Sequence, residues 1–382
     1  MYKHERKFKK RSSGGYNAGL GKLFCLLLGG LLGAFLFAPG RGGEARPGES
    51  APAPLPLVPE SAALASSGPT ANTEVPPAES SQTETPAEGG MQTIELDSPV
   101  VTVSIEGKST EMELEEYLVG VVAGEMPASS EPAALAAQAV AARTFTALHM
   151  AGRAKCGTGC TVCDRASCCQ AYLADDALRE RWGEAYEENI MKIRSAVACT
   201  RGLVSVYEGQ LISALYHASS GPATESSEEV FACALPYLVS VESCEGDHEV
   251  VTRQEFSAAE VVERLNGLYP EANMKLPLGE LDFDIWGRTD SGRVRLIRIG
   301  DTVIPGGYLR MALGLKSTAF EVEKTGETVV FTCFGYGHGV GMSQTGANEM
   351  ARSGSSFEQI LKHFYTGTEL AQLTFKGEKG GA

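Results

Sequence analysis

After residue 22 the sequence contains fewer basic than acidic residues. Residues 1–22 contain seven Lys and Arg against one Glu, a formal charge of +6, whereas the whole chain is at −15, so the remaining residues carry −21. Binding to nucleic acid through phosphate contacts requires clustered Lys and Arg. We therefore expect no nucleic-acid partner.

The sequence also lacks an apolar run of full membrane length. Leu23 to Ala38 is a run of sixteen uncharged residues. As a helix it would span about 24 Å, against a hydrocarbon core of about 30 Å, and Lys22 can extend it by placing its ammonium group at the interface. No small-x-small cleavage site follows Phe37, which favours an uncleaved signal anchor over a cleaved secretory signal. We expect residues 1–22 to be cytoplasmic, residues 23–38 to form a single-pass membrane anchor and the remainder to be extracytoplasmic.

Residues 39–92 contain almost no aromatic residues and no periodic apolar pattern. Their Pro, Ala, Ser, Gly, Thr and Glu bury too little apolar surface to offset the entropy lost on ordering. We interpret this segment as a disordered linker that holds an exported domain away from the membrane. Residues 93–374 then form a single mixed α/β globular domain, followed by a flexible tail over 375–382.

The expected domain shows no internal repeat and no clean βαβ period. Apolar patterns predict strands within residues 94–105, 196–212, 237–241, 294–299 and 328–334, and a closing helix over 357–365. Helices and strands are therefore expected to alternate irregularly.

Residues 114–150 predict two helices that organise this domain. Apolar residues recur at helical spacing, and Pro127 predicts that the first helix ends near Glu125. Start signals at residues 129–132 predict a second, Ala-rich helix that runs to about residue 150. The only formal charge within its span from residue 133 is Arg143.

Two interpretations of Glu125 and Arg143 stay open at this point. In the first they form a buried structural ion pair. In the second the carboxyl of Glu125 is partly dry, and desolvation raises its pKa so that it can act as a general acid near neutral pH.

Five cysteines lie close together after the second predicted helix, at Cys156, Cys160, Cys163, Cys168 and Cys169. Adjacent cysteines rarely bridge each other, but neighbouring thiolates can bind one tetrahedral zinc ion. A disulfide-stapled loop and, less favoured, a cysteine nucleophile are the alternatives.

Two glycine-containing polar segments are candidate sugar-binding loops. They are YHASSGPATESSEEV, with His217, Ser219 and Ser220, and GYGHGVGMSQTGAN, with His338, Ser343 and Gln344. Glycine lets backbone approach a bulky group closely, and hydroxyls and amides match the many donors and acceptors of a sugar chain. Ordinary surface turns are the alternative. The glycine spacing does not fit a dinucleotide-binding motif.

Four long segments carry a family resemblance. They read LEEYLVGVVAGEMP with AALAAQAVAARTF, CDRASCCQAY, YHASSGPATESSEEVFACALPYLVSVES, and GYGHGVGMSQTGANEMARSGSSFEQILKHFYTGTEL. The sequence thereby resembles the stage II sporulation protein D family and the related amidase-enhancer proteins of bacterial cell walls. A membrane anchor and a linker are also typical of that family.

The resemblance implies a lytic transglycosylase that acts on peptidoglycan glycan strands whose stem peptides have been removed. Glu125 matches the family's catalytic glutamate, and Arg143 and Tyr237 match positions that support it. Two residues depart from the pattern: Val239 stands where many members have Lys, and Thr345 stands where Tyr is common.

The resemblance also implies a structural zinc ion, held in clostridial members by two Cys and two His. Cys163 and Cys169 match the two cysteines, and Cys168 stands where one His would be. For the fourth position the sequence offers Cys156, His149 and Cys160, and we take Cys160.

Lytic cleavage of a MurNAc–GlcNAc bond needs only one enzymic acid, because the C6 hydroxyl of the sugar attacks C1 and gives a 1,6-anhydro product. We expect Glu125 to be that acid, with Tyr237 in contact with sugar and Arg143 turned toward substrate or a supporting residue, since a guanidinium beside Glu125 would lower its pKa. The rival hypotheses are a non-catalytic glycan-binding protein that recruits or activates a cell-wall amidase, and a structural partner of a membrane protein in the engulfment machinery.

Overall fold

The computed structural model describes residues 91–279 and 283–377. The predicted cytoplasmic tail, the anchor and all but the last two residues of the predicted linker lie outside the described residues, as do residues 378–382. Within the described ranges, no helix has both the length and the apolar character needed to cross a bilayer. The prediction of a mixed α/β fold is confirmed for the part of the chain that is described.

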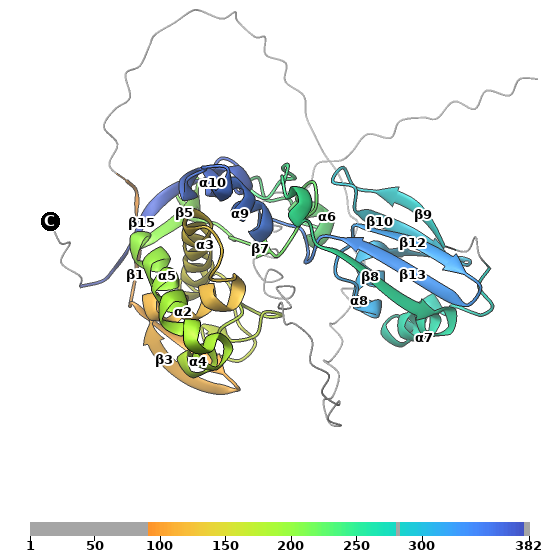
Figure 1. Cartoon of the computed structure of the whole chain (residues 1–382), viewed down its shortest axis with the longest axis horizontal. Coiled ribbons are helices and arrows are strands. Elements are labelled where there is room, and N and C mark those ends of the chain that lie inside the picture. The colour runs from red at the N-terminus through yellow and green to blue at the C-terminus, as the bar shows by residue number, and fades with distance from the viewer. Residues whose placement is uncertain (1–90, 280–282, 378–382) are drawn as a thin grey trace, which may run out of the picture. The chain divides into compact units, whose positions relative to one another are not determined.

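Helix α3 (Pro132–Met150) is the central element of the first of two buried apolar clusters. Every residue from 134 to 149 is buried. The helix contacts α2 (Leu114–Glu125), α5 (Tyr186–Cys199), α9 (Gln344–Arg352), α10 (Phe357–Phe364) and β5 (Leu203–Tyr207), as Figure 1 shows. Its alanines are short, so these neighbours approach it closely from several sides.

The two predicted helices around Glu125 have the expected bounds. Helix α2 ends at Glu125, and Met126 is already extended because it precedes Pro127. Helix α3 begins with Pro132 in its first turn, where the missing N–H costs nothing, and it ends at Met150. The position of Glu125 at a helix end is therefore confirmed.

Three small sheets belong to this first cluster. The strand order of the largest is β1-β15-β5-β6, in which β15 (Glu369–Phe375) pairs parallel with β1 (Thr93–Leu96) and antiparallel with β5, and β6 (Gln210–Leu211) forms the edge. The second has the order β3-β2-β4, with bounds Lys108–Glu113, Val100–Ile105 and Val162–Cys163. The third is the parallel pair of β7 (Tyr216–His217) and β14 (Met342–Ser343). The remaining helices of this region are α4 (Asp175–Trp182) and α6 (Ser227–Phe231).

The second apolar cluster is built from residues between 256 and 333. Its sheets have the orders β12-β13-β8 and β11-β10-β9. The strands are β8 (Val251–Ser257), β9 (Phe283–Arg288), β10 (Val294–Ile299), β11 (Thr302–Pro305), β12 (Phe320–Thr325) and β13 (Thr328–Phe334), joined by helices α7 (Ala258–Leu268) and α8 (Gly306–Leu313). Figure 1 shows α7 beside the sheet that contains β8.

Most of the predicted strands are confirmed, and two segments are corrected. The predicted strand at 196–212 begins only at residue 203, because buried residues at helical spacing extend α5 to Cys199. Residues 237–241 form no regular strand, since their backbone bonds to the loop around Thr224 partly through its side chain. The closing helix ends one residue earlier than predicted, at Phe364.

Candidate active site

The carboxyl group of Glu125 lies at a meeting point of segments that are far apart in the sequence. The Ala171 N–H donates to its Oε1 at 2.6 Å, and the side-chain amide of Gln344 lies 3.5 Å from its Oε2. The Tyr216 hydroxyl, which donates to the Gln170 side chain, also lies close enough to the carboxyl group to lower its pKa. Glu125 is half-buried, so the group is largely removed from water and still reachable from it.

Two glycines on α2 allow the segment with Ala171 to reach Glu125. A Cβ on Gly124 would lie 3.0 Å from the carbonyl oxygen of Ala171, and one on Gly120 would lie 2.4 Å from the ring of Tyr172. Their spacing of four residues puts both glycines on one helix face. The close packing of residues 170–173 on this face aims the Ala171 N–H at the carboxyl group.

Burial raises the pKa of Glu125 to about 7 from its ordinary value of 4.5. The hydrogen bonds from Ala171 and Gln344, and the nearby Tyr216 hydroxyl, act in the opposite direction, because they stabilise the ionised form, but they do not cancel the desolvation. A carboxyl group with this pKa holds comparable populations of its acid and base forms near neutral pH. It can therefore both donate and accept a proton in one reaction cycle.

The tyrosine that reaches Glu125 is Tyr216, not Tyr237. Tyr216 begins the short strand β7, and its hydroxyl donates to the Gln170 side chain at 2.9 Å. Sequence reasoning included Tyr216 in a candidate loop but gave it no role. Its position next to His217 could have indicated such a role. Side chains alternate along a strand, so Tyr216 and His217 point to opposite faces, and Tyr216 therefore faces a different set of neighbours.

A second glutamine joins the same network and was also missed. The Gln344 amide donates to the Gln138 oxygen at 3.3 Å, and Gln138 projects from α3 with no exposure to solvent. The Gln138 amide nitrogen is buried without a hydrogen-bond partner. A buried amide among apolar residues of an otherwise alanine-rich helix is the sequence signal that could have indicated this position.

Arg143 pairs with Glu115 and not with Glu125. Its guanidinium is fully buried and makes a two-pronged contact with the Glu115 carboxylate at 2.9 and 2.7 Å. Its other hydrogen bonds go to Thr200 and to the carbonyl oxygens of residues 197 and 203. The interpretation of a Glu125–Arg143 ion pair is therefore wrong. Glu115 and Glu125 are ten residues apart on α2, about 15 Å along the helix axis, so Arg143 braces the far end of that helix.

Tyr237 is buried, and its side chain is used within the protein. Its hydroxyl accepts a hydrogen bond of 3.1 Å from the Ser213 N–H, and its ring lies 5.6 Å from the ring of Tyr207. Burial raises the pKa of Tyr237. Its predicted contact with sugar stays a prediction, and the geometry found here is that of a packed core residue.

The two predicted loops lie side by side and are held together by a buried acid, Glu245. The carboxylate of Glu245 accepts from the Ser220 N–H at 2.7 Å and from the Ser343 hydroxyl at 2.5 Å, and it also accepts from the hydroxyls of Ser219 and Ser243. Four of the predicted sugar-binding hydroxyl and imidazole groups, those of Ser219, Ser220, Ser343 and His217, are at most 2% exposed. Their direct contact with sugar is untested, and here they serve the internal architecture of the loops.

The two predicted histidines are neighbours with uncharged rings. The ring centroids of His217 and His338 lie 5.5 Å apart. Burial lowers the pKa of His217 well below its ordinary value and lowers that of His338 to about 3. Each ring has a hydrogen bond, His217 to Ser220 at 2.6 Å and His338 from the Val340 N–H at 3.0 Å.

Thr345 joins the two predicted loops. Its backbone N–H and its hydroxyl both donate to the carbonyl oxygen of Ala218 at 3.0 Å. Val239, which the resemblance places where many members have Lys, lies at the surface and is 36% exposed.

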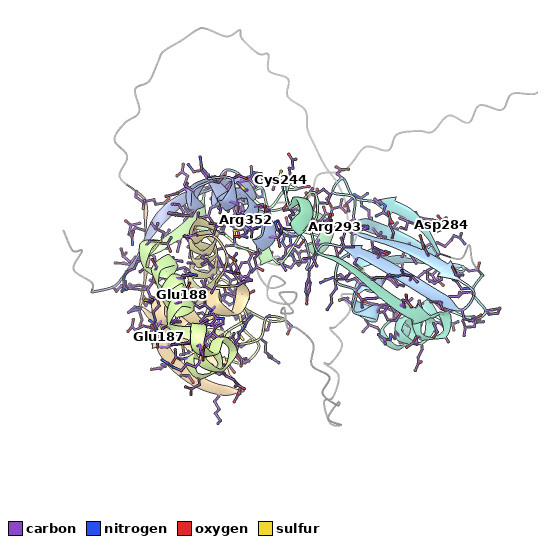
Figure 2. All side chains as sticks on the ribbon, viewed as in Figure 1. Glu187, Glu188, Cys244, Asp284, Arg293 and Arg352 are labelled. Atoms are coloured by element: carbon purple, nitrogen blue, oxygen red, sulfur yellow. The ribbon has the colours of Figure 1, made fainter. Side chains whose placement is uncertain are left out.

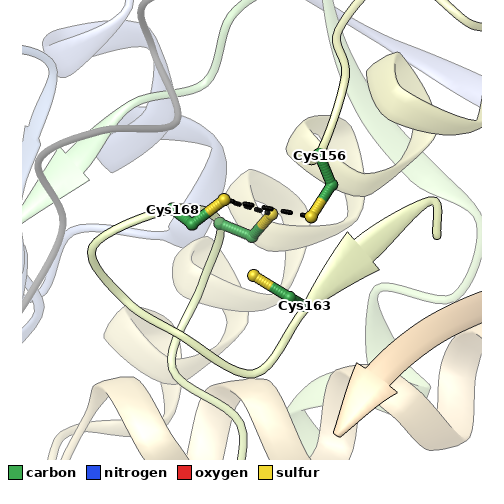
Figure 3. Close-up of side chains that lie close together, drawn as sticks. Cys156, Cys163 and Cys168 are labelled. Atoms are coloured by element: carbon green, nitrogen blue, oxygen red, sulfur yellow. Dashed lines mark hydrogen bonds between the residues drawn. The ribbon is translucent and has the colours of Figure 1, made fainter. Parts of the chain in front are cut away.

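Four cysteines form one cluster, Cys156, Cys163, Cys168 and Cys169, in which all four sulfur atoms lie within 4.8 Å of one another (Figure 3). The sulfur of Cys168 lies 3.9 Å from that of Cys156 and 3.8 Å from that of Cys169. A regular tetrahedral zinc site with Zn–S bonds of about 2.3 Å has sulfur atoms about 3.8 Å apart. None of the five cysteines from Cys156 to Cys169 forms a disulfide bond in the structure, so a disulfide-stapled loop is not what it shows.

The fourth member of the cluster is Cys156 rather than the predicted Cys160. Cys156 is buried and its sulfur belongs to the cluster, whereas Cys160 is only partly buried and lies outside it. His149 is not a member either, and its Nδ1 hydrogen-bonds to the carbonyl oxygen of Phe145, in its own helix, at 2.9 Å. Because Cys169 is two residues before Ala171, the cluster fixes the segment that contacts Glu125.

Comparisons of the sequence with known proteins point to one family. Residues 105–207 match a family model described as "Stage II sporulation protein". The stage II sporulation protein D of Bacillus subtilis is 36% identical over 293 residues, which cover 75% of this chain and 83% of that protein. The chain belongs to the stage II sporulation protein D family.

Two further relatives place the chain within this family. The stage II sporulation protein D of Bacillus amyloliquefaciens is 37% identical over 68% of this chain and 74% of that protein. The amidase enhancer of Bacillus subtilis is 29% identical over 66% of this chain but only 40% of that longer protein. The chain is thus similar to stage II sporulation proteins D over most of their length, and to an amidase enhancer over less than half of its length.

Proposed function

We propose that this protein is a lytic transglycosylase that cleaves MurNAc–GlcNAc bonds in peptide-free peptidoglycan strands during sporulation. The observation that carries the proposal is the half-buried carboxyl of Glu125, whose pKa burial raises to about 7. Its contacts in the described residues are N–H, amide and hydroxyl groups, with no second carboxylate among them. A single titrating acid suits lytic cleavage better than hydrolysis, which ordinarily uses two carboxylates.

In the proposed reaction Glu125 first gives its proton to the glycosidic oxygen while the bond from C1 to that oxygen breaks. The C6 hydroxyl of the same MurNAc then attacks C1, and the Glu125 carboxylate takes up the hydroxyl proton. The 1,6-anhydro bond closes, the enzyme is returned to its protonated state and no water is consumed. The N–H of Ala171 and the Gln344 amide hold the carboxyl group in place through both steps.

The test is digestion of purified peptide-free glycan strands with mass analysis of the ends produced. We expect the parent protein to yield 1,6-anhydro ends and Glu125→Gln to yield at least about 100-fold fewer, the lower range for loss of a general acid. Glu131→Gln, an acid at the start of the next helix, is the matched control and should retain activity. Equal activity of parent and Glu125→Gln would refute the assignment.

We further propose that the cluster formed by Cys156, Cys163, Cys168 and Cys169 holds one structural zinc ion. Support comes from four sulfur donors at tetrahedral spacing within a buried site. The ion would fix the loop that leads to Ala171. Metal analysis of reduced protein should give one zinc per chain, and Cys156→Ser should lower both the zinc content and the melting temperature, whereas Cys160→Ser should change neither. If Cys160→Ser lowered the zinc content and melting temperature and Cys156→Ser did not, the zinc ligands would be Cys160, Cys163, Cys168 and Cys169.

The similarity to an amidase enhancer favours one alternative, a glycan-binding protein that activates or recruits a cell-wall amidase. In that case the strands are bound but no anhydro ends appear, and Glu125→Gln still stimulates an amidase. We also propose the membrane anchor at residues 23–38 and a membrane protein of the engulfment machinery as a partner. Recovery of the full-length protein in a salt-washed membrane fraction tests the anchor, and its release into the soluble fraction would exclude it.

A further inference from the structure

A cavity of about 320 Å³ lies between helix α6, helix α8 and strand β10, and the function proposed above does not use it. Its lining includes three arginines, Arg293, Arg295 and Arg310, the imidazole of His338 and three acids, Glu225, Glu228 and Glu229. Figure 2 shows Arg293 beside α6. We refer to this cavity as the arginine pocket.

Arg310 is a cation with no anionic partner among the described residues. Its Nε is buried and makes no hydrogen bond, and none of the ion pairs in the described ranges includes its guanidinium. Burial, and after it the neighbouring Arg293, lower the pKa of Arg310 to about 10, so the side chain is still charged at neutral pH. Arg310 is partly buried, and its Nε is shielded from water without a hydrogen-bond partner, so an anionic ligand at this guanidinium would supply an interaction that the described residues do not.

Arg293 presents a second unused donor. It is 2% exposed, and its two terminal nitrogens donate to the carbonyl oxygens of Ala223 and Ser220 at 3.2 and 3.0 Å. Its Nε is buried without a partner. The backbone of Gly339 lies against the guanidinium so closely that a Cβ there would meet it at 2.4 Å, which fixes the orientation of the group.

The acids of the arginine pocket do not neutralise Arg310. Glu225 accepts from the hydroxyls of Thr289 and Ser291 at 2.6 and 2.7 Å. Glu229 is paired with Arg295. The third acid, Glu228, is exposed, so water screens its charge. His338 adds no charge of its own, because burial keeps its ring neutral.

An exposed aromatic ring completes the arginine pocket. Tyr308 is 42% exposed, and one face of its ring is covered by the parallel ring of Tyr269, with centroids 4.3 Å apart. The stacking holds Tyr308 in a fixed orientation at the edge of the cavity. An oriented aromatic face beside the partly buried guanidinium of Arg310 suits a ring-shaped ligand that carries an acid group.

We propose that the arginine pocket binds the lactyl carboxylate of a MurNAc residue, with Arg310 as its principal partner and Tyr308 against the sugar ring. This inference rests on the proposed substrate, since removal of the stem peptide leaves the lactyl group as a free carboxylate. A strand that still carries peptides has an amide there and cannot pair with a guanidinium. The arginine pocket would thus select peptide-free strands.

The test is equilibrium binding of a GlcNAc–MurNAc tetrasaccharide to full-length protein in the Glu125→Gln background, which keeps the probe intact. The probe is used as the free acid and after conversion of its lactyl carboxylates to amides. We expect the acid to bind about ten- to a hundredfold more tightly, the range of one charge-assisted hydrogen bond. Arg310→Gln should reduce the ratio to about one, Arg310→Lys should retain part of it, and Arg253→Gln, an exposed arginine of β8, should leave it unchanged.

Stability provides an independent readout. If Arg310 is kept for a ligand, Arg310→Gln should keep or raise the melting temperature, because it removes an unpaired cation from beside Arg293. Equal binding of acid and amide by the Glu125→Gln protein, or a ratio unchanged by Arg310→Gln, would overturn the proposal. Cleavage of strands without discrimination of the acid would refute the pocket alone. Discrimination in a parent protein that produces no anhydro ends would refute only the catalytic proposal.

Discussion

Replacement of Glu125 by Gln should stabilise the folded protein above neutral pH and leave its stability nearly unchanged in acid. The pKa of the carboxyl group is about 7 in the folded chain, against an ordinary value of 4.5. Between these pH values the folded state binds more protons than the unfolded state, so the stability of the parent protein falls as the pH rises. At about 1.4 kcal/mol for each pKa unit, the ionised carboxyl costs the folded chain about 3 kcal/mol at pH 8.

The glutamine side chain of the Glu125→Gln variant avoids this cost because it carries no charge, while its carbonyl oxygen can still accept the Ala171 N–H. Its amide loses the weak contact with Gln344, so we expect a net gain of about 1–3 kcal/mol at pH 8 and almost none at pH 4. Urea unfolding of both proteins at the two pH values measures this difference, with the slopes checked for equality.

Glu113→Gln is the matched control, because Glu113 is exposed just before the same helix and its side chain does not cap it. It should change stability by less than about 0.5 kcal/mol at either pH. The prediction is wrong if Glu125→Gln is less stable than the parent at pH 8, or if its free energy of unfolding differs from that of the parent by the same amount at pH 4 and pH 8. Either result would show that the folded carboxyl ionises as an ordinary acid. It would then be unsuited to protonate a leaving group at neutral pH.

Two other changes probe the framework around the site. Glu115→Ala leaves the buried Arg143 without its carboxylate and should lower the free energy of unfolding by about 3 kcal/mol or more. Glu116→Ala removes a carboxylate from an exposed ion pair and should lower it by less than about 1 kcal/mol. Equal losses of the two variants in urea titrations would contradict the structural role of Arg143. Glu245→Gln places an amide donor among the donors of both loops and should cost about 3 kcal/mol. Hydrogen exchange should then show faster opening of residues 216–221 and 340–344, and unchanged exchange would mean that Glu245 does not hold the loops together.

The ends of the helices around Glu125 were predictable because the signals for them are local. Pro127 prevents α2 from continuing, and Pro132 fits the first turn of α3. The same local signals placed Glu125 at a helix end. The strand predicted at 237–241 failed for the complementary reason, since its backbone hydrogen-bonds to the distant loop around Thr224, which the local sequence does not reveal.

The neighbours of Glu125 and Arg143 were not predictable in this way. Gln344 lies 219 residues from Glu125 along the chain, and Glu115 lies 28 residues before Arg143. A pattern of charges shows that a buried group needs a partner, but not which of several acids supplies it. The tertiary structure pairs Arg143 with Glu115. Glu125 therefore has no neighbouring guanidinium from Arg143 to lower its pKa.

The sequence by itself determined the two helices around Glu125, the ends of these helices and the residue types able to do acid chemistry and bind a metal, because these depend on local sterics and on the chemistry of single side chains. Only the tertiary structure decided that Cys156 rather than Cys160 completes the cluster, that Glu245 joins the two loops and that Arg310 lacks a counterion. Each of these depends on distances of a few ångströms between segments brought together by packing, and on how far that packing removes a charge from water.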